Sequence, residues 1–141
     1  MSTFITAADY DQAIKAGILA RITDGGNHAN LLDDAETKAI SFMQGYLNAR
    51  YDVDAIFSAT GTDRHPIIVK FCVDIALYYL YSRLQAEQVP EFRKENHDHA
   101  EKWLRGVMKA DINPPGLPKL PDGAKDYIAF GGRTPQNLFI D

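Results

Sequence analysis

The residues of this 141-residue chain that could hold a metal ion are too few or wrongly spaced to share one. His97 and His99 lie in the run ENHDH, and imidazole nitrogens are good zinc ligands. On a helix, however, side chains two positions apart point about 160° away from each other, so these rings cannot reach one ion. Asp52 and Asp54 could ligate a cation, but they lack the third ligand and the spacing of a calcium loop. We therefore predict no metal site, expect the histidines at the surface or edge of a helix, and expect residues 52–65 to form a solvated loop.

Groups that could catalyse a reaction are equally dispersed. Gly25 and Gly26 could in principle cradle a phosphate, but no strand precedes them and no Gly-Lys-Ser/Thr follows. The single cysteine, Cys72, lies within an apolar run, which predicts a buried, inert thiol rather than a nucleophile or a disulfide. The chain has no serine in a nucleophile-elbow motif. The sequence thus predicts a protein that is not an enzyme and needs no cofactor, although folding could still bring distant acid and base groups together.

The run from Pro66 to Leu84, PIIVKFCVDIALYYLYSRL, predicts a helix that is apolar on nearly every side. Proline suits the first turn of a helix, where its missing N–H is not needed. At about 100° per residue, the polar side chains fall into one narrow stripe, in which tyrosines combine apolar rings with polar tips. The members of this polar stripe are Lys70, Asp74, Tyr78, Tyr81 and Gln85. Such a helix must be covered by other helices or by neighbouring subunits, so we expect it at the centre of the fold. We further predict that Tyr78, Tyr81 and the 52–65 loop form surfaces between subunits.

A helix is also expected near the start of the chain. Thr6 is a good N-cap and Asp9 stands in the capping-box position three residues later. Gly17 is expected to end this helix, because glycine readily adopts the conformation that follows a helical C-terminus. The loop signal Asp24-Gly25-Gly26-Asn27 then separates this region from the rest of the chain.

Two longer helices complete the predicted body. One runs from about Asn30, its expected cap, to Arg50, and the other from near Pro90 to about Lys109 with Phe92 on its apolar face. Four large side chains are expected to be mostly buried: Phe42, Phe71, Leu77 and Trp103. The predicted fold is all-α, a small bundle of four main helices within residues 1–112.

Residues 113–141 differ in composition from this body. The stretch from residue 111 to the end holds five of the seven prolines and four of the ten glycines, so it cannot form a long helix. Aromatic side chains nevertheless recur in it, and an irregular segment with apolar side chains usually has a partner. We predict an extended, largely irregular C-terminal arm that docks on another subunit or on a partner protein. The residues expected to make that contact are Tyr127, Phe130, Arg133 and Phe139.

The bulk composition limits the possible functions. A hydrophobic content of 45% with 24% charged residues is ordinary for a globular protein. The formal net charge of −4 argues against a general nucleic-acid binder, which needs a basic face. There is no charged segment followed by an apolar one near the start, and the apolar run is too short for a membrane span. We expect a single soluble domain made in a cytoplasm, with no membrane partner.

Four segments resemble the Mu-like prophage head–tail connector proteins of tailed phages, also called head-completion or adaptor proteins. They are FITAADYDQAIKAGILARITDG, YLNARYDV, CVDIALYYLYSRL and VPEFRKENHDHAEKWLRGV, and they follow one another in order along the predicted helices. The resemblance covers about residues 4–118, and FGGR in the arm is similar to the C-terminal ends of some members. Within the 52–65 loop, the run AIFSATGTDRH is longer than the corresponding segment of the family pattern. Whether this loop makes the contacts that the resemblance implies is therefore left open.

The resemblance implies a structural virion protein that is made in the cytoplasm of a bacterial host. Such subunits form a ring, commonly of about twelve copies, beneath the portal protein of a filled capsid. The ring extends the DNA channel and meets the next connector or the tail, and connectors of this type often reach their portal with a C-terminal segment. An acidic subunit suits a channel through which DNA slides without specific binding.

Two other classes of function remain open. A small helical DNA-packaging or DNA-binding protein of the same phage would need a basic helix face. The only candidate is Lys94, Lys102, Arg105 and Lys109, which is interleaved with acidic residues. An enzyme would need a deep polar pocket with converging titratable groups.

Overall fold

The computed structural model describes residues 4–23 and 30–121, and this part of the chain is helical. The prediction of an all-α fold is therefore confirmed. In chain order the helices are α1 (Ala7–Ala13), α2 (Ala16–Ile22), α3 (Asn30–Leu47), α4 (Val53–Ser58), the 3-10 helix η2 (Gly61–Asp63), α5 (Pro66–Ser82), the 3-10 helix η3 (Ala86–Gln88) and α6 (Glu91–Met108). Within the described residues, no helix is both long and apolar enough to cross a membrane.

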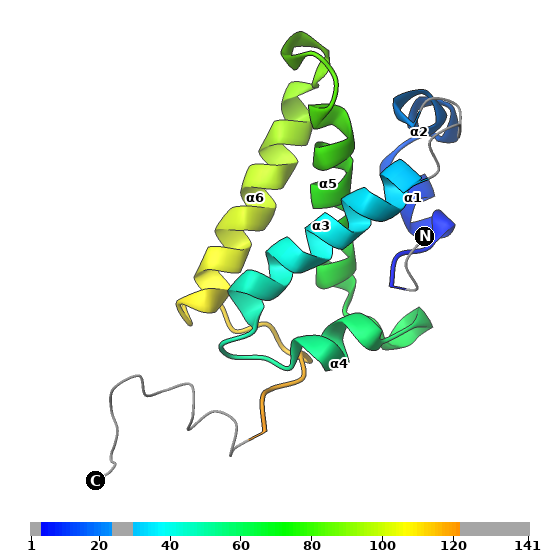
Figure 1. Cartoon of the computed structure of the whole chain (residues 1–141). Helices are drawn as coiled ribbons and strands as arrows, with labels where there is room; N and C mark the ends of the chain where they lie inside the picture. Colours follow the sequence, from blue (N-terminus) through cyan, green and yellow to red (C-terminus); the bar gives the residue numbers. More distant parts are fainter. Residues whose placement is uncertain (1–3, 24–29, 122–141) are drawn as a thin grey trace, which may run out of the picture.

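Helix α5 lies at the centre, as its sequence predicts. It contacts α3, α6 and α1. Figure 1 shows α6 running beside α5, α3 crossing both helices, and α1 and α2 on the side of α5 opposite α6. Pro66 occupies the first turn, and nine of the helix's residues are buried. Because α5 is apolar around most of its circumference, it needs cover on several sides, and these helices supply it.

The four side chains expected in the core differ in burial. Leu77 is 0% exposed, whereas Phe42, Phe71 and Trp103 are only partly buried. The rings of Phe71 and Trp103 lie 5.2 Å apart, so they cover each other at the edge of the α5–α6 contact. All three aromatic residues pack against the core, so the expectation of mostly buried side chains holds, although only Leu77 is fully enclosed.

The N-terminal segment forms two short helices. Thr6 caps α1 through the predicted capping box with Asp9. The prediction that Gly17 ends this helix is wrong: α1 ends at Ala13, Ile14 is extended, and Gly17 lies inside α2. Ile14 is 6% exposed, and the change of chain direction at this residue buries its side chain. Because Ile14 is extended and not left-handed, ending α1 here does not require a glycine.

The predicted 52–65 loop is also wrong, because this segment contains α4 and η2. The side chain of Asp52 accepts a hydrogen bond from the backbone N–H of Ala55 and so caps α4, which gives this carboxylate a local role. Ile56 is 3% exposed, and the ring of Phe57 contacts that of Phe4 at 5.0 Å. A short helix becomes stable here because its apolar side lies against the N-terminal segment.

The end of α6 and the residues beyond it are attached to the body. Asp111 N–H donates to the Gly106 carbonyl and Ala110 N–H to that of Val107, which is a Schellman arrangement with Ala110 at φ 67°. Arg50, expected at the end of its own helix, lies past Leu47, where α3 ends; its guanidinium donates to the carbonyl of Val107 and to Asn113 Oδ1. This arginine therefore caps α6 and binds the chain that leaves it.

Residues 113–121, the beginning of the predicted arm, run along the body. Leu117 is 6% exposed, Asp52 N–H donates to the Pro118 carbonyl, and Tyr51 and Lys119 form an isolated bridge. Figure 1 shows this orange segment passing α4. The division between body and arm after residue 112 stays a prediction, but the first arm residues already contact the segment that connects α3 and α4.

Candidate functional site

The two tyrosines predicted as subunit contacts lie in different surroundings. Tyr81 is 7% exposed, and the guanidinium carbon of Arg93 lies 5.7 Å from the centre of its ring. Tyr78 is partly buried and stacks on the ring of His97, with the centroids 4.3 Å apart. The polar stripe is exposed only in part: the Lys70 side chain is 59% exposed and Gln85 is exposed, whereas Asp74 is buried at 5% exposed. Whether either tyrosine meets another subunit stays a prediction.

His97 lies in an aromatic cluster between α3, α5 and α6. Besides Tyr78, its ring approaches Phe42 at 5.7 Å and Tyr79 at 6.4 Å. Burial raises the pKa of Tyr79, so this phenol stays neutral at ordinary pH. We expected the histidines at the surface or edge of a helix. His97 is partly buried at the edge of α6, where it contacts α3 and α5, and His99 is exposed at the surface.

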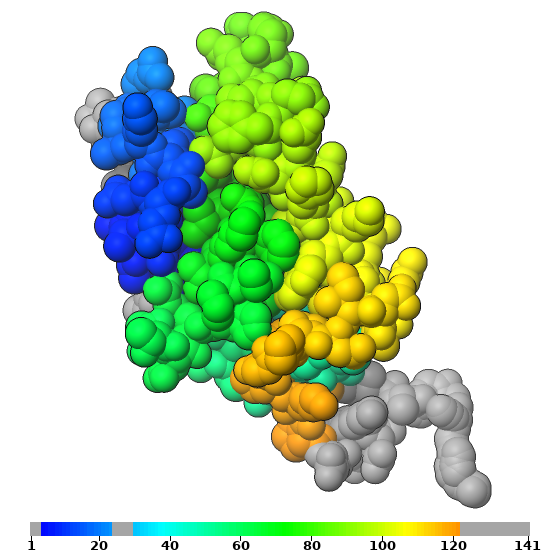
Figure 2. Space-filling model, turned by 180° about the vertical axis from the view of Figure 1, so that it is seen from behind, coloured from blue at the N-terminus to red at the C-terminus, as the bar shows by residue number. Residues whose placement is uncertain are grey.

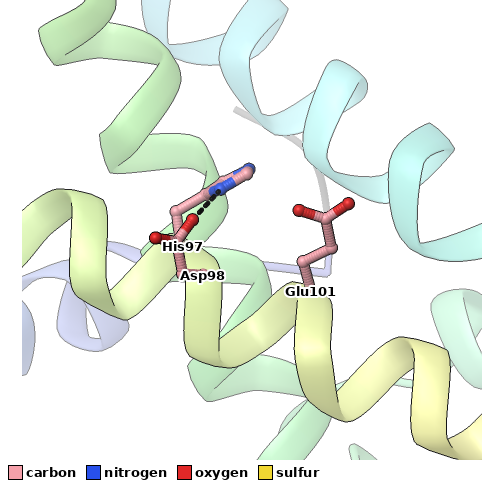
Figure 3. A group of neighbouring side chains, drawn as sticks. All are labelled: His97, Asp98 and Glu101. Carbon is pink, nitrogen blue, oxygen red and sulfur yellow. Dashed lines mark ion pairs between the residues drawn. The ribbon is translucent and has the colours of Figure 1, made fainter.

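His97, Asp98 and Glu101 are the described residues whose arrangement comes nearest to a metal site. Their possible ligand atoms lie within 4.8 Å of one another, and Figure 3 shows all three side chains on one stretch of α6. Glu101 is already engaged, because its Oε2 accepts hydrogen bonds from Tyr46 Oη at 3.0 Å and from Arg105 Nη2 at 2.7 Å. These two hydrogen bonds lower the pKa of Glu101. A cation at this position would have to displace Arg105 from Glu101, and one of its ligands, Asp98, has a side chain that is 77% exposed. The arrangement therefore fits a structural contact between α3 and α6, made by Tyr46 and Glu101, better than a metal site.

The described surface has a groove between the N-terminal helices and α5–α6. Two adjoining depressions form it, and both are lined by Ala13, Phe92 and Arg93. Figure 2 shows this face, with the N-terminal residues (blue) on one side of α5 (green) and α6 (lime to yellow) on the other. We call it the α1–α6 groove. The prediction that Phe92 belongs to the core is wrong: its side chain is 51% exposed, on the rim between the two depressions.

Cations outnumber anions in the α1–α6 groove. Its lining contains Lys15, Arg21, Arg64, Lys70 and Arg93 but only Asp9 and Asp74, a net charge of +3 on a chain whose total is −4. Two of the cations are ion-paired: Arg64 with Asp9 at 2.5 Å, and Lys70 with Asp74 at 2.8 Å. The groove is therefore apolar with a positive balance, and its pairs of opposite charge stabilise the body.

Arg93 is the most unusual residue of the groove. It is 3% exposed, and its Nη2 donates to the carbonyl of Ala13, the last residue of α1. Its guanidinium also lies over Phe92 and Tyr81, at 4.6 and 5.7 Å. Within the described part of the chain, its Nε has no hydrogen-bond partner. A buried donor without a partner is costly, so the burial of Arg93 is offset by its other contacts, with Ala13, Phe92 and Tyr81.

Four of the predicted contact residues, Tyr127, Phe130, Arg133 and Phe139, lie outside the described residues. The pair Gly25-Gly26 does so as well. Their predicted roles are therefore carried forward from the sequence alone.

Comparison with protein families identifies the relatives of this body. The family model for bacteriophage Mu Gp36 matches residues 4–125, which is most of the chain and includes every described helix. The chain belongs to the bacteriophage Mu Gp36 family. No curated protein and no solved structure matches it. The protein is thus a Mu-like phage protein, in agreement with the phage origin that the sequence indicated.

Sequence reasoning missed the α1–α6 groove of this Gp36-family chain. Arg93 looked like one more charge on a mixed helix, and its burial depends on α1 ending at Ala13 directly opposite. Phe92 looked like a core residue because it follows the apolar period of α6. One signal in the sequence could have indicated the groove. Phe92 and Arg93 lie in the first turn of α6, just after Pro90, where a side chain has no preceding helical turn to pack against and so tends to contact another element.

Proposed function

We propose that this protein is a head–tail connector, or adaptor, that forms a ring beneath the portal and extends the DNA channel toward the tail. The observation that carries the proposal is the Gp36-family match over residues 4–125, which joins the whole helical body to phage Mu. The same segments resemble the connectors of Mu-like prophages in their order and in the RYDV and DIALYYLYSR runs. We place the protein in the virion, with the portal and the next connector or tail protein as its neighbours.

The geometry of the body supports a structural role without turnover. The two carboxylates of the α1–α6 groove, Asp9 and Asp74, are each ion-paired within the groove, with Arg64 and Lys70, and these pairs do not form an acid and a base that act on one substrate. The buried Cys72 is 0% exposed, and burial raises the pKa of its thiol, so it is a poor nucleophile. These features favour an assembly component over an enzyme.

The alternative, a DNA-packaging or DNA-binding protein of the same phage, has weaker support. On the candidate basic face of α6, Arg105 is bound to Glu101, and Asp98 lies nearby on the same helix. A binder that neutralises several phosphates loses affinity steeply as salt rises. We expect the protein to show only weak DNA binding without a steep salt slope; a slope equivalent to several phosphate contacts would favour the alternative.

The test of the connector proposal uses heads from a phage mutant that lacks this protein. Purified protein added to DNA-filled heads should co-sediment with those that carry a portal, and electron micrographs should show an added ring at the portal vertex. Heads without a portal are the matched control and should bind none. Protein that never joins portal-bearing heads and never forms rings, at any concentration, would contradict the proposal.

A further inference from the structure

The α1–α6 groove is an open hollow with a mainly apolar lining. Its first depression has a volume of about 770 Å³ and is lined by residues of α1, η2, α5 and α6. Phe92, 51% exposed, stands on its rim, and the unpartnered Nε of Arg93 lies beside it. An exposed aromatic residue next to a buried arginine is typical of the centre of a protein–protein contact.

The character of the groove fits an extended segment with aromatic and acidic side chains. Its lining carries a net charge of +3, so it favours a ligand that brings carboxylates. Residues 122–141 supply Asp122, Asp126 and Asp141 against Lys125 and Arg133. The same segment carries the aromatic residues Tyr127, Phe130 and Phe139. An Asp126 carboxylate would complement the positive charge of the groove beside Arg93 while Tyr127 covers Phe92.

The length of the chain indicates which copy provides this segment. The described chain ends at Pro121, beyond the contacts of Lys119 with Tyr51, near the C-terminal end of α6 that Arg50 caps. Phe92 lies near the other end of this helix, about 24 Å from Met108 along the helix axis. The six residues from Pro121 to Tyr127 span about 20 Å when fully extended. The near end of the groove, at Arg64 and Pro66, lies next to His65, which contacts the Pro115 carbonyl, so the exiting chain starts close to that end. Tyr127 nevertheless falls short of Phe92 in its own subunit, and it reaches Phe92 only in a neighbour placed beside the exit point.

We infer that the α1–α6 groove binds the 122–141 segment of a second copy of this chain. Asp126 and Tyr127 meet Arg93 and Phe92, and each subunit both receives one segment and gives one. Because the donor and acceptor surfaces differ, such a contact is head-to-tail and propagates around a ring. The inference rests on the proposed function for its setting, and it adds the partner and the surface that would join neighbours.

Disulfide trapping in the full-length protein tests this contact. A Phe92→Cys chain with an affinity tag is mixed at high concentration with an untagged Tyr127→Cys chain, under mild oxidation. We expect a mixed disulfide-linked dimer, recognised by its size. The native Cys72 is 0% exposed and does not compete. Phe92 is exposed and Tyr127 follows the described helical body in the sequence, so we expect neither change to prevent folding.

The matched control places the cysteine at Met108, which is 41% exposed at the opposite end of α6. A Met108→Cys chain mixed with Tyr127→Cys should give at least about tenfold less mixed dimer, the ratio expected if the specific contact is worth 1.4 kcal/mol. Equal yields at Phe92 and Met108, or none at Phe92, would overturn the inference. A double Phe92→Cys/Tyr127→Cys chain that links within itself at high dilution would show that the segment binds its own body instead.

A second measurement does not depend on disulfide geometry. A synthetic peptide of residues 122–141 should bind the full-length protein and lower its self-association in sedimentation experiments, whereas a peptide with Asp126→Asn and Tyr127→Ala should not. Both measurements use the purified protein alone. Trapping at Phe92 without binding to heads would therefore refute the connector proposal and leave this inference standing. Binding to heads without trapping at Phe92 would refute this inference and leave the connector proposal standing.

Discussion

At the scale of single residues, burial decides how much a side chain stabilises the fold. Leu77 and Phe71 lie six positions apart on the same apolar helix, and the sequence predicted equal burial for them. In the structure Leu77 is fully enclosed, whereas Phe71 shares its exposure with Trp103 at the edge of α6. The sequence cannot distinguish the middle of a covered face from its margin, because this depends on how closely α3 and α6 approach.

The two residues should therefore respond differently to truncation. Leu77→Ala removes buried methyl groups and leaves a cavity, so we expect a loss of about 2–5 kcal/mol in the free energy of unfolding. Phe71→Ala should cost clearly less, because the ring is partly in contact with water and Trp103 can close over the gap. Urea denaturation followed by Trp103 fluorescence for Leu77→Ala, and by circular dichroism for Phe71→Ala, measures both. A larger loss for Phe71 would show that the margin of α5 is covered in solution.

Ala110 gives a prediction of the opposite sign. It occupies the left-handed position of the Schellman turn after α6, with φ 67°, where the Cβ of an L-residue is unfavourable. Ala110→Gly should raise the free energy of unfolding by up to about 1 kcal/mol, since relief of this strain exceeds the added flexibility of the unfolded chain.

Gly106, in the same turn, provides the contrast. A Cβ at this position would lie 2.6 Å from Cδ1 of Ile112, so Gly106→Ala must displace Ile112 and should destabilise the protein. Thermal melts of the two variants beside the parent chain compare the two effects. A lower melting temperature for Ala110→Gly would contradict the assignment of strain to Ala110.

At the scale of elements, Arg64 attaches the N-terminal helix to the rest of the bundle. Its guanidinium pairs with Asp9 and donates to the carbonyl of Phe4 at 2.7 Å, while its Nε donates to that of Gly61 at 2.9 Å. One side chain thus joins the segment before α1, α1 itself and η2. Burial raises the pKa of Asp9, but hydrogen bonds from Arg64 and Thr6 together lower it by more, so the pKa lies below its ordinary value of 3.8.

This pair predicts a dependence of stability on acid. A carboxyl whose pKa is lower in the folded than in the unfolded state stabilises the fold above the unfolded value and loses this contribution as pH falls below it. The parent protein should therefore lose stability as pH falls below 3.8. Asp9→Asn keeps an oxygen for the cap of Thr6 but cannot ionise, so it should be less stable at neutral pH and lose less in acid. Parallel acid titrations of the two proteins that fell equally would contradict this role.

The elements also show what the sequence could and could not predict. Helices α5 and α6 were placed to within a few residues, because Pro66 and Pro90 mark their starts and their apolar periods are long. Helix α4 was missed because it has only six residues, and what stabilises it is distant in sequence: Phe4 against Phe57. Arg93 and Tyr81 were missed as a buried pair for the same reason, since their contact needs α1, α5 and α6 to be in place.

At the scale of the whole molecule, charge is unevenly distributed. The chain has a net charge of −4, yet the lining of the α1–α6 groove has +3, so the remaining surface is more acidic than the average suggests. An acidic outer surface with one positive, apolar groove favours ordered association between copies and disfavours binding to phosphates. By our proposals, copies of the body would assemble through the α1–α6 groove, and DNA would pass without specific binding.

The last prediction separates the body from the segment that follows it. A chain that ends after Pro121 keeps buried Leu117 and the hydrogen bond from Asp52 to Pro118, so its thermal stability should match that of the full chain. It lacks residues 122–141, and by our proposals it should no longer join neighbouring subunits or enter phage heads. A chain that ends after Gly116 is the control for stability: it exposes the site of Leu117 and leaves Asp52 N–H without its partner, so it should melt at a lower temperature. Heads assembled in a host that supplies each variant, assayed for infectious particles, measure incorporation. Normal particle yield with the chain ending at Pro121 would show that residues 122–141 are dispensable, and a lowered melting temperature of that variant would place them in the fold of the subunit itself.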